Sequence, residues 1–196
     1  WWTYIHGDST GGGGIYNSGT FSLFDCDISH NTAYTSGTGG GIHHQSGTLM
    51  LTRCSIHNNK SGNGLLSCCR AQHGGNGGGI FNESTMTVTN CTVSGNYSGT
   101  GTSDEYEEIG GNGGDGAGIY NRGTLNLINS TLCYNTTSLG GNAHDAKGRS
   151  GYGGGIYNLA GSILNIKNTI LANNKTAVDG EGPDAWGALD SQGYNL

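Results

Sequence analysis

The sequence is poor in charge, in proline and in long apolar stretches, and each shortage excludes a class of protein. Only 11% of the 196 residues are charged and the formal net charge is −6, so we expect no nucleic-acid partner. A single proline beside ten tyrosines and many branched apolar residues argues against a disordered chain. No apolar stretch approaches the roughly 20 residues of a membrane-spanning helix, so no membrane span is expected.

Glycine is abundant, with 40 residues, and much of it lies in a repeated phrase. The phrase reads GGGIYN, GGGIHH, GGGIFN, GAGIYN and GGGIYN. Its isoleucines are Ile15, Ile42, Ile80, Ile119 and Ile156, which are 27, 38, 39 and 37 residues apart. Recurrence at this length indicates a repeat architecture.

A second phrase follows each copy of the first and carries apolar residues at alternate positions. It begins at Phe21, Leu49, Met86, Leu125 and Leu164. Two apolar columns two residues apart predict a strand with one buried face, and the interruption before a third column predicts a corner. Three short strands per copy make one triangular coil, which buries its apolar face only by stacking on neighbouring coils. The sequence therefore predicts an all-β fold, a parallel β-helix of about five coils.

We expect one domain over residues 1–196, with coils that start near residues 12, 39, 77, 116 and 153 and a closing segment at 178–196. Gly-rich inserts at 61–76, 99–115 and 136–152 account for the longer spacings. They are expected to bulge from one corner, where loops do not disturb the stack. Neither end carries a long polar cap, so either the chain is a fragment or exposed strand edges drive end-to-end self-association into a filament.

Asparagine closes the second phrase in every copy. These residues are Asn31, Asn59, Asn96, Asn135 and Asn174. Asn tolerates the left-handed backbone of a sharp corner, and stacked amides can hydrogen-bond from coil to coil. We interpret this column, together with the isoleucine column, as a structural ladder.

The paired phrases, GGGI followed by segments such as Ile28–Asn31 and Ile56–Asn59, resemble the repeats of bacterial polymorphic outer-membrane proteins and related surface β-helix proteins. Five paired copies carry this resemblance over nearly the whole chain. It implies a right-handed parallel β-helix that is exported and displayed at the cell surface, with an adhesive or structural role. It implies no catalytic residue, because the family's motif builds coils.

Six cysteines are candidates for disulfide bonds: Cys26, Cys54, Cys91, Cys68, Cys69 and Cys133. The first three share an inward column that Ser130 and Thr169 continue, so they are either small buried hydrophobes or include one vertical disulfide. Cys133 is expected to face outward, while Cys68 and Cys69 lie in an insert. Export would favour oxidation of these last three.

Aromatic side chains alternate with the inward isoleucines and are expected to form an outward stripe. The stripe consists of Tyr16, His43, Phe81, Tyr120 and Tyr157. Stacked rings stabilise a sheet face, and an exposed apolar stripe would also suit a partner such as a carbohydrate or another rod.

The acidic run at 104–108, with Asp115 after it, is interpreted as a solvated loop. Calcium stays a candidate ligand there, although the spacing fits no known calcium repeat. No other cofactor, metal or catalytic residue is expected.

Three functions follow from these patterns. The leading one is an extracellular or cell-surface structural or adhesive protein that is not an enzyme. The first alternative is a polysaccharide-binding or polysaccharide-cleaving β-helix, although its four arginines are scattered and no paired carboxylates lie on a strand. The second alternative is ice binding, which the threonine column of Thr20, Thr48, Thr85 and Thr124 supports.

Overall fold

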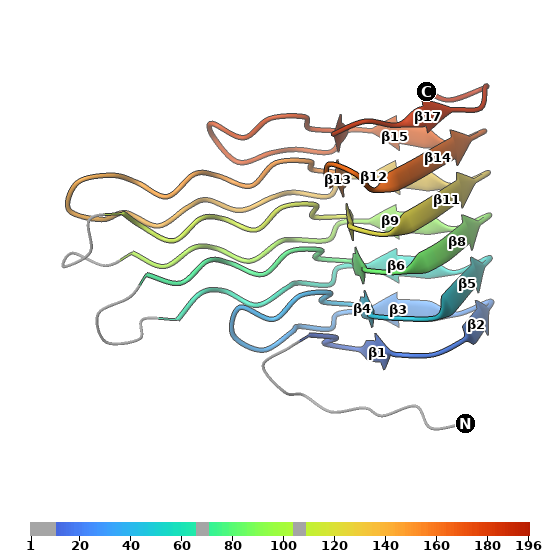
Figure 1. Ribbon diagram of the computed structural model, residues 1–196, viewed down its shortest axis with the longest axis horizontal. Coiled ribbons are helices and arrows are strands. Elements are labelled where there is room, and N and C mark those ends of the chain that lie inside the picture. Colours follow the sequence, from blue (N-terminus) through green and yellow to red (C-terminus); the bar gives the residue numbers. More distant parts are fainter. Residues whose placement is uncertain (1–10, 66–70, 104–108) are drawn as a thin grey trace.

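A computed structural model describes residues 11–65, 71–103 and 109–196, and its regular elements are all β-strands. The chain passes through three parallel sheets in turn, so that each strand pairs with its equivalent in the next copy of the repeat. Figure 1 shows these copies stacked one above another. The predicted parallel β-helix is thus confirmed. The described residues contain no helix long and apolar enough to cross a membrane.

The three sheets are named A, B and C in chain order. Sheet A contains β1 (Ile15–Asn17), β4 (Ile42–His44), β7 (Ile80–Asn82), β10 (Ile119–Asn121), β13 (Ile156–Asn158) and β16 (Ala185–Trp186). Sheet B contains β2 (Phe21–Phe24), β5 (Thr48–Thr52), β8 (Thr85–Thr89), β11 (Thr124–Ile128), β14 (Ile163–Lys167) and β17 (Asp190–Ser191). Sheet C contains β3 (Asp27–Ser29), β6 (Ser55–His57), β9 (Thr92–Ser94), β12 (Thr131–Cys133) and β15 (Ile170–Ala172).

The number of coils differs slightly from the five predicted. Five coils contribute a strand to every sheet, and β16 and β17 add a partial sixth. In that last coil Ala185 pairs with Ile156, and Ser191 pairs with Ile166. Small residues therefore continue the apolar columns, which is why the repeated phrase is hard to recognise there.

The interior is the continuous apolar column that the repeat predicts. Strand pairing places the five phrase isoleucines side by side in sheet A, in one row. Four of them, Ile42, Ile80, Ile119 and Ile156, have no exposed surface. They pack in one cluster with the inward residues of sheets B and C.

The asparagine ladder is also confirmed. Each side-chain Nδ2 donates to the Oδ1 of the next residue, at 2.9, 3.1, 2.9 and 2.9 Å from Asn31 up to Asn174. The same Oδ1 atoms accept backbone N–H groups from the coil below. At the top, Asn174 donates to Asp184 at 2.9 Å. The ladder thus satisfies buried amides from the first coil to the last.

The backbone at this corner differs from the expectation in one respect. The left-handed conformation belongs to the residue before each ladder asparagine, namely His30, Asn58, Gly95, Tyr134 and Asn173. This residue makes the turn, and the asparagine side chain can therefore point into the interior.

A second polar column lies at the end of the sheet A strands and was not predicted. Its members are Asn17, His44, Asn82, Asn121 and Asn158. Asn82 donates to Asn121 and Asn121 to Asn158, both at 2.7 Å, while His44 lies 2.9 Å from Asn17. The last residue of the repeated phrase, Asn in four of five copies, was the available signal.

The inserts leave the β-helix at one corner, between sheet C and sheet A, as expected (Figure 1). They span residues 30–41, 58–79, 95–118, 134–155 and 173–184. Their described parts run out and back and hydrogen-bond to one another, and we name this layer the glycine lamella. Gly62 donates to Gly37, Gly75 to Gly62 and Gly99 to Gly75, at 2.8, 2.7 and 3.0 Å between N and O.

A parallel set of bonds lies three residues further out, where Gly111 donates to Thr102 and Gly141 to Gly111, at 3.0 and 2.8 Å. A three-residue period is that of the polyproline II conformation, whose backbone makes no internal hydrogen bonds and must find partners elsewhere. In the lamella those partners are the neighbouring inserts, so the inserts form an ordered layer.

Candidate functional site

The predicted aromatic stripe forms a stack along the outer side of sheet A. Ring centroids lie 5.1, 5.0, 5.0 and 4.9 Å apart from Tyr16 through Tyr157, and Trp186 of β16 extends the stack at 4.5 Å. One aromatic ring per coil thus stacks continuously from the first coil to the partial sixth.

This stack is largely buried, so the expectation of an exposed partner-binding stripe is wrong. His43, Phe81, Tyr120 and Tyr157 are only 5–9% exposed. The glycine lamella lies against them, for example through Tyr152, whose ring is 5.9 Å from Trp186. Burial raises the pKa of Tyr120 to about 12. The rings therefore join the lamella to the β-helix instead of meeting a partner.

A charged cluster surrounds His43, the one imidazole in the stack. Its Nε2 lies 3.3 Å from Glu83 Oε2, and its Nδ1 lies 3.0 Å from Thr38 Oγ1. Arg122 Nη1 contacts the other Glu83 oxygen at 3.0 Å. Burial lowers the pKa of His43, and the hydrogen bond to Glu83 opposes this effect only in part.

A hydroxyl, an imidazole and a carboxylate in a row is also the arrangement found in nucleophilic hydrolases. Such enzymes need free backbone N–H groups that stabilise an oxyanion. Here the N–H groups of Gly39, Gly40 and Gly41 donate to carbonyls of the next coil. These three N–H groups beside Thr38 are therefore engaged in strand-like bonds between coils.

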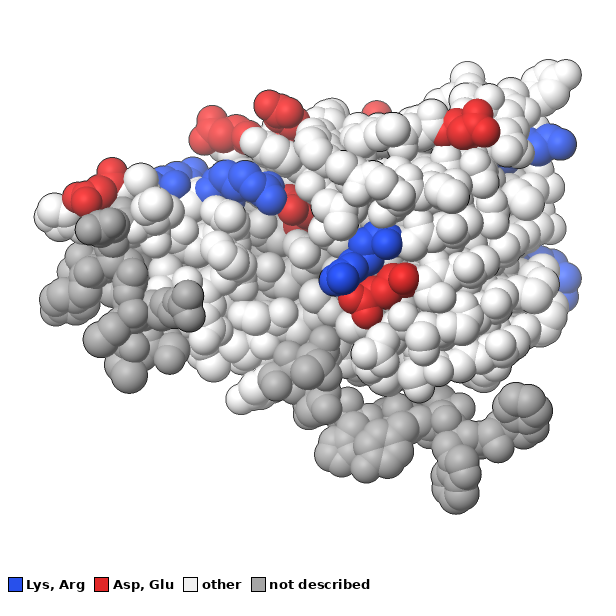
Figure 2. Space-filling view, in the orientation of Figure 1, with Lys and Arg blue, Asp and Glu red and all other residues white. Residues whose placement is uncertain are grey.

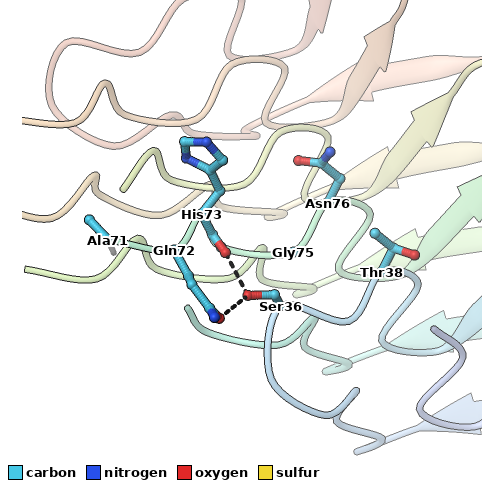
Figure 3. Close-up of a pocket in the computed structure, with 8 residues that line it drawn as sticks. Ser36, Thr38, Ala71, Gln72, His73, Gly75 and Asn76 are labelled. Carbon is cyan, nitrogen blue, oxygen red and sulfur yellow. Dashed lines mark hydrogen bonds between the residues drawn. The ribbon is translucent and has the colours of Figure 1, made fainter. Parts of the chain in front are cut away.

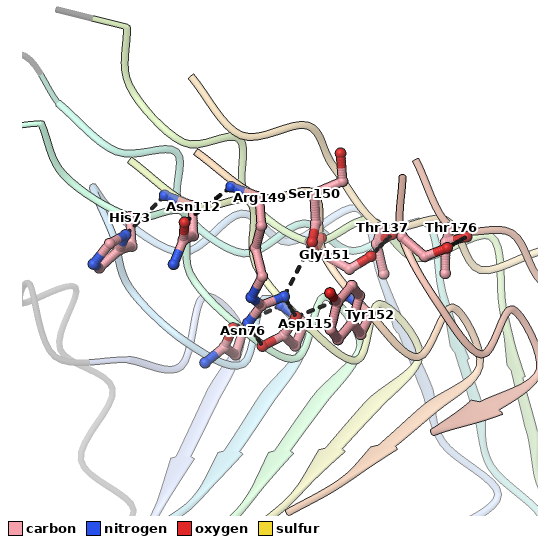
Figure 4. Close-up of polar contacts among 12 residues, drawn as sticks. His73, Asn76, Asn112, Asp115, Thr137, Arg149, Ser150, Gly151, Tyr152 and Thr176 are labelled. Carbon is pink, nitrogen blue, oxygen red and sulfur yellow. Dashed lines mark hydrogen bonds and ion pairs between the residues drawn. The ribbon is translucent and has the colours of Figure 1, made fainter. Parts of the chain in front are cut away.

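A second charged cluster holds the lamella together near the stack (Figure 4). Arg149 makes two bonds of 2.7 Å to the carboxylate of Asp115, and its guanidinium lies 4.4 Å from the centre of the Tyr152 ring. Asp115 Oδ1 also accepts the Tyr152 backbone N–H at 2.8 Å. Asp115 raises the pKa of Arg149, chiefly through its hydrogen bond.

The Arg149 contact bears on the calcium site that was considered around Asp115. Asp115, which was considered as a ligand, is engaged by Arg149, and the acidic run at 104–108 lies outside the described residues. Among residues 11–65, 71–103 and 109–196 no group of three or more metal-binding side chains comes together. The described arginines Arg53, Arg122 and Arg149 each pair with one carboxylate. In the view of Figure 2, most of the surface apart from a few such charged side chains is uncharged.

A hollow of about 540 Å³ lies at the edge of the lamella, between residues 71–76 and the pair Ser36 and Thr38 (Figure 3). It arises because the second insert, 58–79, is much longer than the first, 30–41. Ser36 Oγ donates to the His73 carbonyl at 2.9 Å, and Asn76 Oδ1 accepts the Asp115 N–H at 2.7 Å. These two contacts join neighbouring inserts around the hollow.

The described cysteines are free thiols, namely Cys26, Cys54, Cys91 and Cys133. Cys54 and Cys91 are buried in the predicted inward column, where the Cys54 N–H lies 3.3 Å from Cys91 Sγ. Burial raises the pKa of the Cys91 thiol. The structure therefore matches the buried-thiol interpretation of this column. Cys68 and Cys69 lie outside the described residues.

The outer side of sheets B and C in the third and fourth coils forms an open surface. We call it the neutral wall, and all of its side chains are uncharged and at least partly exposed. It consists of Thr85, Thr87, Thr89, Asn90, Thr92 and Ser94 in one coil and Thr124, Asn126, Ile128, Asn129, Thr131 and Cys133 in the next. Of the predicted threonine column, Thr85 and Thr124 lie in the wall and pair with each other. Thr48 pairs with Thr85 one coil below the wall, and Ile163 occupies the equivalent position one coil above it.

No family model, curated protein or solved structure matches this chain. The properties of the site therefore rest on the geometry above.

Proposed function

We propose that this chain is a structural and adhesive module displayed outside the cell. One observation carries the proposal: two columns of buried polar side chains run through the β-helix. Their members hydrogen-bond mainly to equivalent residues in adjacent coils. Satisfied buried networks of this kind rigidify a fold. Reactive groups such as His43, Glu83 and Asp115 are likewise engaged within the chain.

The shape of the molecule supports the same proposal. The lamella projects from one corner as a layer of hydrogen-bonded inserts (Figure 1), which widens the β-helix into a broad, stiff body. Low charge and the neutral wall leave an uncharged polar surface open to contact with solids or other cells. The resemblance to surface β-helix repeats is consistent with display outside the cell.

Protease resistance tests this proposal, because a displayed scaffold must survive extracellular proteases. Purified protein is incubated with proteinase K and cleavage is followed by mass spectrometry. We expect the described inserts, apart from the exposed segment 142–147, to resist cleavage, since their backbone is hydrogen-bonded to neighbours. Rapid cutting within 109–118 or 148–155, or release of sugar products from polysaccharides, would count against a purely structural module.

End-to-end assembly remains a separate proposal with less support. Pairing at the sixth coil would use β16 and β17, which have two residues each, and Asp190 lies on that edge. Short and charged edges oppose strand pairing. Light scattering over a range of concentrations decides the matter, and growth into filaments would show that the ends do associate.

A further inference from the structure

We propose that the neutral wall binds a neutral polysaccharide chain, an inference that rests on the adhesive part of the proposed function. The carbohydrate partner expected at the aromatic stripe has little access to His43, Phe81, Tyr120 and Tyr157, because these four rings are buried. The wall lies on sheets B and C, whereas the lamella lies against sheet A.

The chemistry of the wall fits hydroxyl-rich, uncharged polymers. Its Thr, Ser and Asn side chains offer both donors and acceptors, as sugar hydroxyls do. No wall residue is charged, so contact requires no ion to be desolvated. An anionic polymer would meet little free positive charge here: Arg122, at the edge of the wall before Thr124, is paired with Glu83. Lys167 lies one coil above, and Arg53, one coil below, is paired with Asp25.

The wall is also pre-organised. Strand pairing fixes Thr85 beside Thr124, Thr87 beside Asn126 and Thr92 beside Thr131. Equivalent residues in adjacent coils lie about 4.8 Å apart, and β-branched side chains have few rotamers in a strand. Little side-chain entropy is lost on binding, which favours contact with a repetitive chain.

The area of the surface argues against a second copy of this protein as the partner. The outer face of sheet B, with five full strands about 4.8 Å apart and about 17 Å long, covers only about 400 Å². A specific protein interface needs about 800 Å² from each partner. The corner at Asn90 and Asn129 turns sheet C away, so a flat protein surface cannot use both sheets.

Sedimentation with insoluble polysaccharides tests the proposal. The full chain is mixed with amorphous cellulose, with amorphous chitin and with cross-linked polygalacturonate, whose flexible chains can follow the corner between sheets B and C, and the unbound fraction is measured. We expect retention on at least one of the two neutral solids, insensitive to salt, and none on the anionic gel. Thr87→Lys on sheet B and Thr131→Lys on sheet C are each expected to reduce retention about tenfold. Asn142→Lys, at an exposed position of the lamella, is the matched control and should bind as the unaltered chain does.

Several results would overturn the proposal: no retention on either neutral solid, equal retention of all variants, or retention only on the anionic gel. Ice shaping that Thr87→Lys abolishes would assign the wall to an ice lattice instead. Protease resistance is measured on the same samples. A resistant chain that binds no polysaccharide refutes this inference alone, whereas a susceptible chain refutes the proposed scaffold.

Discussion

Gly99 illustrates how a chain with 40 glycines can be well ordered. An ideal Cβ built on it would lie 1.9 Å from the Gly62 carbonyl oxygen, which belongs to a neighbouring insert. Gly99→Ala must therefore push two inserts apart, and we expect unfolding free energy to fall by about 2–4 kcal/mol in urea titrations. At Gly19 no atom lies within 4 Å of such a Cβ, so Gly19→Ala should be neutral or stabilising. Equal losses in both variants would contradict the close packing.

Asn96 lies at the centre of the asparagine ladder and has no exposed surface. Its Oδ1 accepts two bonds from Asn59, and its Nδ2 donates to Ile56 and Asn135. Asn96→Ala leaves several buried groups without partners, and we expect a loss of about 3–5 kcal/mol by urea titration. Asn142→Ala, at an exposed position, should change stability by less than about 0.5 kcal/mol. A small loss at Asn96 would mean that water can replace the ladder bonds.

Ser150 carries a hydroxyl that is buried in the lamella without a hydrogen-bond partner. Removing it with Ser150→Ala should raise the unfolding free energy by about 1 kcal/mol, because an unsatisfied buried group is lost. Thr137 provides the contrast, since its hydroxyl donates to Gly151 and accepts from Ala177. Thr137→Val should destabilise the protein by a similar amount. Calorimetry on both variants checks whether the two changes have opposite signs.

At the scale of elements, the strands and the corner from which the inserts project were predictable, but the ordered packing of the inserts was not. Alternation in segments such as Leu125–Ile128 reports burial directly, because one face of each strand meets the interior. The inserts have no such alternation: their order comes from backbone bonds between distant segments, which glycine permits without leaving a side-chain pattern. The position of the lamella also explains why Tyr120, correctly expected on the outer side of its strand, is buried.

Strand β4 introduces a dependence on pH, because it carries His43 and His44 where other strands have another ring and asparagine. Burial lowers the pKa of both below 6.5, although Glu83 beside His43 opposes the effect and Arg122 adds to it. The unfolded chain therefore binds protons first as the pH falls. Stability that is present above about pH 6.5 is lost as the pH drops through the lowered pKa values.

His44→Asn tests this dependence, since it places in β4 the residue found at the same position in β7, Asn82. We expect the melting temperature of the unaltered protein to fall between pH 7 and pH 5, and that of the variant to fall less. His144→Asn, at an exposed position of the lamella beside Asp145, is the control for loss of a histidine outside β4. Identical slopes in all three proteins would remove His44 as the source.

For the whole molecule, one repeat builds two layers with different chemistry. Within each coil, about a dozen residues form strands, which are stabilised by buried apolar side chains. Most of the rest form an insert, whose close backbone packing requires glycines without a side chain. The two layers meet at the aromatic stack and at the Asp115 and Arg149 pair. Because bonds cross from every described insert to its neighbours, we expect the β-helix and the lamella to unfold together.

Hydrogen exchange followed by mass spectrometry tests whether the β-helix and the lamella unfold together. Insert amides such as Gly114, which donates to Gly99 at 2.8 Å, and Gly151, which donates to Ser138 at 2.9 Å, should exchange as slowly as the amides of β11. Residues 142–147, most of which are exposed, should exchange fast and serve as the internal control. Gly99→Ala should accelerate exchange in inserts and strands alike, because opening either layer exposes the aromatic stack that joins them. Fast exchange confined to the inserts would instead mean that the lamella opens alone, and that the rigidity needed by a displayed scaffold resides in the β-helix only.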